Sequence, residues 1–397
     1  MKLFQRLLVA PAALGLLAPM TATNATEVNL NEISNYSEKE IEINSNSFNK
    51  LSSTNPLLLA GGEGMSSDYS PDSFSDTTTA SFSADFLIGA VDNHSSGEAV
   101  SAVYGYGIGL STSFTGEDSF FVSLDAGSGQ GPLGEADLNS TADALTVDGI
   151  GYQFPVGDKM QVVVGDSIDG STLYSTACVY GGFTNTLDDC GNANSGIAGA
   201  TNGSVGLSAS YDIGGGWVAA VGYNGEGTVA DGLLTKAGQD LYAGQVAYTA
   251  DSYGISLTMA NVESATKTST ALNEYYADTT YYAVNAYWTP EETGVVPSIS
   301  VGFENGNVEA DETTATDTNQ WFVGFQWDEA GAGVLGASIG SAGAQASDAA
   351  EDLSMYEVFY SYPLNDGMTI TPAVYVQEQA AGTDDITGVM VKTSFAF

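Results

Sequence analysis

Basic side chains are nearly absent from this sequence of 397 residues. Lysine and arginine together number eight against 49 aspartate and glutamate residues, and Arg6 and His94 are the only residues of their types. Binding to nucleic acid or to anionic lipid headgroups needs a positive patch, which this chain lacks the residues to build. A single histidine also excludes metal sites built from histidine clusters. We therefore expect no nucleic-acid partner, no bound metal and no cofactor.

Long hydrophobic runs are missing as well. After the N-terminal segment no stretch reaches 18 consecutive apolar residues, which excludes an ordinary membrane-spanning helix. Apolar residues nevertheless make up 43% of the chain, and only 14% of residues are charged. A chain of this composition has enough apolar side chains to fold and too few charges to be a disordered polyelectrolyte.

The first 25 residues have the three parts of a secretory signal peptide. Lys2 and Arg6 provide the positive start, and an uncharged apolar stretch follows from 7 to 20. Thr23-Asn24-Ala25 is a small-x-small site, so we predict cleavage after Ala25. The alternative, a buried N-terminal helix, does not explain why the three parts occur in this order.

Two further regions follow the signal peptide. Residues 26–78 are polar and rich in Ser, Asn and Glu, which indicates a poorly ordered periplasmic extension or linker. From 79 to 397 the chain consists of short runs in which apolar and polar residues alternate, the pattern of β-strands. We count sixteen runs, with approximate spans 79–90, 101–114, 119–127, 143–153, 159–167, 203–211, 216–224, 240–249, 253–262, 280–289, 296–304, 319–327, 333–341, 354–362, 368–378 and 387–397.

The connections between these runs alternate in length. Most even-numbered connections are short, such as 115–118 and 250–252, whereas most odd-numbered ones are long, such as 168–202. In an antiparallel sheet, odd and even connections lie at opposite ends. Short turns at one end and long loops at the other are typical of a transmembrane antiparallel β-barrel, and an even strand number leaves both chain ends on the short-turn, periplasmic side.

A soluble β-sandwich also shows alternation, so other features must separate the two folds. Sixteen strands are many for one sandwich but are the size of a porin barrel. Tyr and Trp cluster near strand ends, as in the aromatic girdles of membrane barrels. One face of each strand is small or polar, which predicts a hydrated lumen without large apolar side chains. The inward candidates are Gly105, Gly107, Gly109, Ser123, Asp125, Ser208, Ser210, Gln245, Thr258, Ser298, Ser300, Thr369, Thr371 and Gln377.

Several stretches resemble cyanobacterial outer-membrane porins of the carbohydrate-selective or iron-uptake porin superfamily. They are the start of the signal peptide, residues 74–79 before the first strand, and the strand-turn segments 112–118 and 152–158. Most members of that family carry a surface-layer-homology domain and a coiled coil before the barrel. Residues 26–73 are too short for both. The resemblance covers the signal peptide and essentially all of 74–397.

The resemblance implies a cell outer-membrane location and passive diffusion of small hydrophilic solutes and inorganic ions, with iron species or small sugars as candidates. We expect a homotrimer and no enzymatic activity. The C-terminal strand places Phe395 and Phe397 on one face, and the terminal aromatic residue is similar to the ending that the barrel-insertion machinery reads.

The longest connection, 168–202, contains both cysteines of the chain, Cys178 and Cys190. Two cysteines in one loop of an exported protein are expected to form a disulfide. By resemblance to porins, this third long loop is expected to fold into the lumen and set the constriction. The candidate constriction residues are then Asp169, Asp188 and Asp189. A stapled loop on the surface is the alternative.

Charge suggests the selectivity of such a pore. Nine of the 49 acidic residues precede residue 79, which leaves 40 in the barrel region against four lysines and no arginine. Acidic rings favour cations, so we expect a cation preference. The alternative is that most of the acids decorate the outer loops.

Two other classes of protein remain as alternatives. A surface-exposed β-rich adhesin or structural outer-membrane protein would have the same strands without a pore. An enzyme carried on a barrel would need a nucleophile and a base. His94 beside Ser95 and Ser96 is a weak candidate for that chemistry, because a lone loop histidine is usually solvated. We name no catalytic residue.

Overall fold

The structure, a computed structural model, describes residues 78–129, 131–194, 205–227, 232–235, 238–263, 278–292, 294–309, 316–349 and 351–396. The chain divides into two compact units, 1–61 and 62–397, and every described residue belongs to the second. The expected signal peptide and nearly all of the extension 26–78 lie outside the described residues.

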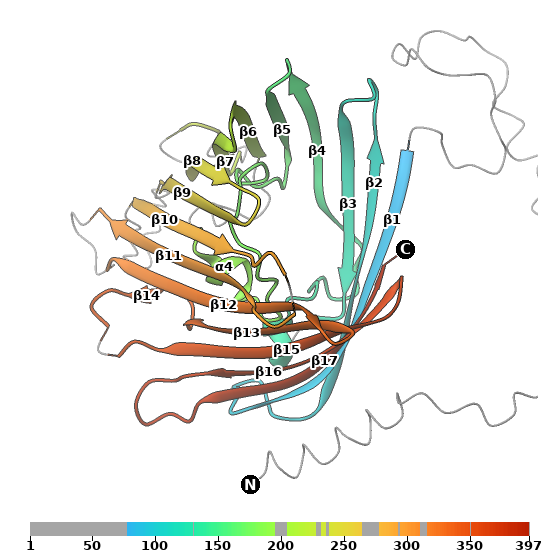
Figure 1. Cartoon of the computed structure of the whole chain (residues 1–397), viewed down its shortest axis with the longest axis vertical. Helices are drawn as coiled ribbons and strands as arrows, with labels where there is room; N and C mark the ends of the chain where they lie inside the picture. Colours follow the sequence, from blue (N-terminus) through green and yellow to red (C-terminus); the bar gives the residue numbers. More distant parts are fainter. Residues whose placement is uncertain are drawn as a thin grey trace, which may run out of the picture. The chain divides into compact units, whose positions relative to one another are not determined.

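The described residues form an almost entirely β structure (Figure 1). The strands are β1 (Thr78–Asp92), β2 (Ser101–Thr112), β3 (Ser119–Gly127), β4 (Thr146–Val156), β5 (Met160–Asp166), β6 (Val205–Gly214), β7 (Trp217–Gly225), β8 (Asp240–Thr249), β9 (Tyr253–Val262), β10 (Thr279–Trp288), β11 (Ser298–Val308), β12 (Thr318–Ala330), β13 (Gly333–Ser341), β14 (Gln345–Ala346), β15 (Ser354–Asn365), β16 (Met368–Gln377) and β17 (Ile386–Ala396). Two short helices lie between strands, the 3-10 helix η3 (Gly131–Ala136) and α4 (Asp188–Asn192).

Sixteen of these strands close into one antiparallel barrel. Each strand pairs with the next along the chain, and β1 pairs with both β2 and β17, which joins the two edges of the sheet. The two-residue strand β14 lies in the connection between β13 and β15 and pairs with the end of β12. The predicted all-β barrel of sixteen strands is confirmed, with most strand ends within about three residues of the expected positions.

The connections alternate in length as expected. Those at one end are short, such as 157–159 and 215–216, and those at the other are long, such as 167–204 and 263–278. The first residues of β1 and the last of β17 lie at the short-turn end, where Ser83 pairs with Ala396 (Figure 1).

The strands expose their apolar face outward. In β9 the apolar residues are exposed, with Leu257 at 58%, whereas Ser256 and Thr258 on the other face are buried. A water-soluble sheet does the opposite and hides its apolar face. Closure of the barrel pairs the backbone hydrogen-bonding groups of neighbouring strands within the wall, and the outer surface is apolar. A bilayer requires both.

Among the described residues, no helix is long and apolar enough to cross a membrane.

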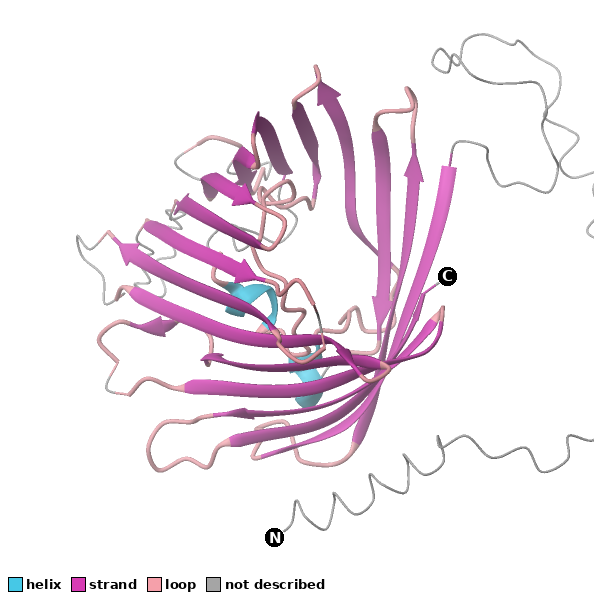
Figure 2. Ribbon diagram, in the orientation of Figure 1, coloured by secondary structure: helices cyan, strands magenta, loops and turns pink. Residues whose placement is uncertain are grey.

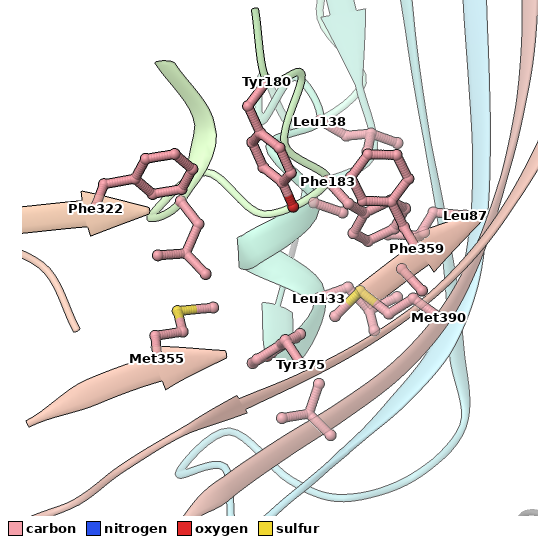
Figure 3. Close-up of a cluster of buried hydrophobic side chains, with 14 of the residues drawn as sticks. Leu87, Leu133, Leu138, Tyr180, Phe183, Phe322, Met355, Phe359, Tyr375 and Met390 are labelled. Carbon is pink, nitrogen blue, oxygen red and sulfur yellow. The ribbon is translucent and has the colours of Figure 1, made fainter. Parts of the chain in front are cut away.

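The barrel interior contains a cluster of apolar side chains, which the sequence did not predict. Strands supply Leu87, Phe322 and Met390, and the cluster is completed by residues from two long connections that fold inward (Figure 3). The expectation of a lumen without large apolar side chains is therefore wrong along this part of the wall. The physical reason is that the inward connections bury their own apolar side chains against the strands.

Candidate functional site: the connections inside the barrel

The connection from β5 to β6, residues 167–204, lies on the inner face of the barrel over its described part, which ends at Asn194. Figures 1 and 2 show this segment, with helix α4, inside the ring of strands. Its first residues rest directly on the wall. A Cβ atom added to Gly206 would lie 1.6 Å from the carbonyl oxygen of Ile168, and one added to Gly222 would lie 2.2 Å from that of Gly170. The close approach therefore requires glycine at both wall positions.

Polar side chains of successive strands bind the backbone of this connection. Asn224 of β7 accepts a hydrogen bond from the Gly170 amide at 2.6 Å and donates one to the Ile168 carbonyl at 2.7 Å. Gln245 of β8 does the same for Ser175, at 2.8 and 2.9 Å. An irregular segment leaves its backbone groups unpaired, and these amide side chains supply the missing partners.

The same arrangement continues across the next strands. Asn285 of β10 donates to the Thr176 carbonyl at 3.0 Å. The hydroxyl of Ser300 in β11 accepts from the amides of Val179 and Tyr180, at 3.0 and 3.2 Å. The inward polar residues of β7, β8, β10 and β11 therefore form a track that holds the connection along the wall.

Glu357 of β15 ends this track. Its side chain is only 2% exposed. It accepts hydrogen bonds from the Tyr180 hydroxyl at 2.8 Å, the Phe183 amide at 3.0 Å and the Thr184 amide at 2.6 Å. Three donors to one buried carboxylate make charge-assisted bonds that compensate for its removal from water.

The disulfide between Cys178 and Cys190 closes the segment that carries these donors. Cys190 is completely buried, and it lies in α4 against β11 and β12. The following residue, Gly191, has φ of +70° and packs on Phe322, where a Cβ atom would lie 2.8 Å from the phenylalanine side chain. The bridge thus joins the outgoing and returning parts of the connection.

A second connection, 128–145, also folds inward. Its helix η3 places Leu133, which is fully buried, in the apolar cluster with Leu87 and Met390 (Figure 3). Glu135 joins the two connections, because its carboxylate accepts from the amide and hydroxyl of Thr186 at 3.2 and 3.1 Å. Its carbonyl accepts from the Asn185 amide at 2.8 Å.

The predicted constriction residues are not gathered at one point. Asp169 lies at the start of the connection, where its charge interacts with Asp148 of β4. Asp188 lies in the segment that the disulfide closes, between Cys178 and Cys190, which we call the tip of the connection. It accepts a hydrogen bond from the Gly182 amide at 2.9 Å, and Lys392 of β17 is close enough to interact with its charge. Asp189 is exposed beside it, with φ of +45°.

Three carboxylates of β3, β4 and the start of the connection follow one another in a row. Asp125 of β3 interacts with Asp148, and Asp148 with Asp169. Asp125 is half-buried and accepts a hydrogen bond from the Thr146 hydroxyl at 2.6 Å. Burial raises the pKa of Asp169, and the neighbouring Asp148 raises it further.

The sequence reasoning missed the roles of Glu357, Glu135 and Lys392. Glu357 did carry a signal, since it is a single acid on the inward face of a strand whose other inward residues are Met355 and Phe359. Gln245 and Ser300 were correctly expected on the inner face, but not as partners of the connection.

The remaining candidates lie elsewhere in the barrel. Phe395 packs edge-to-face on Phe86 of β1 with ring centres 6.0 Å apart, and Phe397 lies outside the described residues. His94 accepts a hydrogen bond from the amide of Ser96 in its own loop at 3.1 Å.

Comparison with solved structures identifies the architecture. The barrel is similar to an anion-selective porin from Comamonas acidovorans, with a TM-score of 0.57 and 15% identity over 81% of this chain and 99% of that one. It is also similar to OprB of Pseudomonas putida (TM-score 0.55, 9% identity, 81% and 94% covered). OmpT of Vibrio cholerae, described as a trimer form, gives a TM-score of 0.55 at 12% identity over 81% and 100%.

The fold is that of the outer-membrane porins. No protein-family model and no curated protein matches the chain. The closed sixteen-strand barrel with an apolar outer face belongs in a cell outer membrane, because a single-layer barrel of this kind has no other way to cover that face.

Proposed function

We propose that the chain is an outer-membrane porin that allows passive diffusion of small hydrophilic solutes and inorganic ions, with a preference for cations. The observation that carries the proposal is the charge of the barrel interior. Asp125, Asp148 and Asp169 follow one another along β3, β4 and the start of the inward connection.

The physical argument concerns ions near fixed charges. Carboxylates at the border of a narrow aqueous path lower the energy of a passing cation and raise that of an anion. The effect is strongest where low-dielectric protein surrounds the path, because field lines are then focused into the water. Acids on the outer loops would act only within about a Debye length, roughly 8 Å at physiological salt.

The fold alone does not determine the sign of selectivity. The Comamonas acidovorans barrel is described as anion-selective, and it shares this architecture at 15% identity. The proposal therefore depends on the charged residues of this chain and not on the similarity.

Further parts of the proposal come from the resemblance and from the neighbours' descriptions. We infer a homotrimer, since one neighbour is described as a trimer form. We also infer export by the segment 1–25, insertion that depends on Phe395 and Phe397, and a relation to the cyanobacterial carbohydrate or iron-uptake porins. Iron species, small sugars and inorganic ions are the candidate solutes.

The test is a bilayer recording of the purified, folded protein under a KCl gradient. We expect discrete conductance steps and a reversal potential that is displaced from zero toward the K⁺ equilibrium potential. Steps without ion preference would support the pore but contradict the proposal that the interior acids make it cation-selective. Correctly folded protein without steps would favour the adhesin or structural protein.

A charge variant separates the interior acids from those of the outer loops. The triple substitution of Asp125, Asp148 and Asp169 by asparagine should move the reversal potential toward zero. A matched triple, with Asp348, Asp384 and Asp385 in the long connections changed to asparagine, removes the same charge and should leave it nearly unchanged. The opposite ranking would locate the selectivity in the outer loops.

A further inference from the structure

Among the described residues, one basic side chain lies on the inner face of the barrel. Lys392 of β17 pairs with Leu87 of β1 and Thr371 of β16, both of which are buried on that face. The other described lysine, Lys159, lies in the short turn before β5 and contacts Tyr211 at the barrel end.

Lys392 contacts the tip of the inward connection. Its Nζ atom lies 5.1 Å from the centre of the Phe183 ring, a cation–π distance. Phe183 is 5% exposed and its backbone amide donates a hydrogen bond to Glu357, so the ring provides a fixed surface for the ammonium group. The charge of Lys392 also stabilises the carboxylate of Asp188 nearby.

Lys392 is positive, whereas the charged side chains around it are acidic, so its effect on a passing ion has the opposite sign to theirs. A lysine side chain can pack its aliphatic part on apolar neighbours while its ammonium group stays at the far end, and that group of Lys392 lies over Phe183 and beside Asp188 on the inner face. At the tip it offsets Asp188, while the row formed by Asp125, Asp148 and Asp169 has no basic neighbour among the described residues. Lys392 therefore offsets part of the negative charge at the tip, whereas the row of three aspartates is not offset in this way.

We propose that Lys392 is a specificity-determining residue, which limits the cation preference of the pore by offsetting part of the negative charge at the connection tip. The proposal rests on the proposed function, because it concerns the selectivity of the same pore. Its prediction is specific in sign: removal of a positive charge should make the pore more selective for cations.

The experiment compares Lys392→Met with the wild-type protein in a planar bilayer under a KCl gradient. Methionine keeps an unbranched apolar side chain of similar length beside Phe183 but removes the ammonium group and its charge. A unit charge a few ångströms from a passing ion in water changes relative occupancy by about two- to five-fold. Because the charge acts in opposite senses on K⁺ and Cl⁻, we expect the ratio of K⁺ to Cl⁻ permeability to rise by at least that factor, and by less in concentrated salt.

Two variants control for other causes. Lys159→Met removes the same charge from the short turn and should keep the wild-type reversal potential. Lys392→Arg keeps the charge over the ring and should also keep the wild-type reversal potential. Gel mobility with and without heating would verify that each barrel is folded.

The outcomes are distinct. If the wild-type protein gives steps but Lys392→Met has the same reversal potential, the role of Lys392 is overturned and the porin proposal stands. An equal shift in the Met and Arg variants would assign the effect to packing of the tip and overturn the electrostatic role. Absence of steps from folded wild-type protein overturns the proposed function, and this inference with it.

Discussion

The hydroxyl of Tyr180 donates a 2.8 Å hydrogen bond to the carboxylate of Glu357, 177 residues further along the chain. The bond joins the tip of the inward connection to β15 of the barrel wall. Both side chains are buried, and the Tyr180 ring also packs on Phe322 and Phe359, with ring centres 5.2 and 5.9 Å apart. The position of the tip is therefore fixed by the wall that it covers.

Replacing Glu357 with glutamine should loosen the tip without unfolding the barrel. The amide side chain accepts more weakly than a carboxylate and places an NH₂ group against either the Phe183 amide or the Thr184 amide, which donate to different oxygens of Glu357. We expect a loss of about 1–3 kcal/mol in the packing of the tip. Single-channel recordings should show more open-channel noise.

Glu329→Gln, at an exposed position near the end of β12, is the matched control for Glu357→Gln. It should behave like the wild type. Equal noise from both variants would contradict the role of Glu357 as the anchor of the tip.

Removal of the disulfide should free the same segment. The double variant Cys178→Ala and Cys190→Ala removes a cross-link that spans 12 residues, worth about 3 kcal/mol in the chain-entropy model. Hydrogen exchange should become faster at the amides of 179–184, which bond to Ser300 and Glu357. Amides within the strands serve as an internal control, and faster exchange there would mean that the bridge stabilises the whole barrel.

Leu133→Ala should destabilise the packing of the second inward connection. Leu133 is completely buried in the apolar cluster on the inner wall, so truncation leaves a cavity. The loss in the free energy of unfolding should be about 2–5 kcal/mol. Urea-induced unfolding followed by tryptophan fluorescence measures the change. Val221→Ala, at an outward position that is 57% exposed, should cost much less. Equal losses would place Leu133 outside the stabilising core.

The turn between β2 and β3 should make stability depend on acid pH. The Tyr152 hydroxyl, which donates to Asp118 at 2.6 Å, and donors of 113–115 hold the pKa of Asp118 well below its ordinary value of 3.8. A lowered folded-state pKa stabilises the fold above the unfolded pKa, and this contribution is lost as pH falls toward the folded-state value. Thermal unfolding between about pH 6 and pH 2 should show this slope.

Asp118→Asn should be less stable than the wild type near neutral pH and should lose part of the acid slope. Tyr152→Phe, which removes only the hydroxyl, should give an intermediate result. A slope that is the same in all three proteins would show that other carboxylates cause it.

Cation preference should weaken on acidification. Burial raises the pKa of Asp188, with Lys392 acting in the opposite direction, and burial followed by the charge of Asp148 raises that of Asp169. Both carboxylates should therefore take up protons at a pH above the ordinary aspartate value of 3.8 and lose their attraction for cations. Reversal potentials measured across this range test the prediction. A double variant with asparagine at both positions should give a flatter profile, and an unchanged profile would contradict the assignment.

The strand arrangement could be predicted from the sequence because it depends on local patterns. The alternation of Tyr253 to Met259 fixes which side chains share a face, and the lengths of the connections fix which ends they join. A closed antiparallel barrel is the solution that satisfies all backbone hydrogen bonds when the apolar face points outward. The pairing of β1 with β17 then follows from closure.

The sequence alone therefore determined the barrel, its strand number, the end of the barrel at which the first strand starts and the last strand finishes, and the acidic character of the chain, since each depends on period, length or composition. Only the tertiary structure decided that 128–145 and 167–194 lie against the inner wall, that Glu357 anchors the tip and that Lys392 faces Phe183. These relationships join residues that are far apart along the chain, 177 positions in the case of Tyr180 and Glu357 and more for Phe183 and Lys392. They arise from the curvature of the closed wall, which brings distant strands to one interior and which no local pattern encodes.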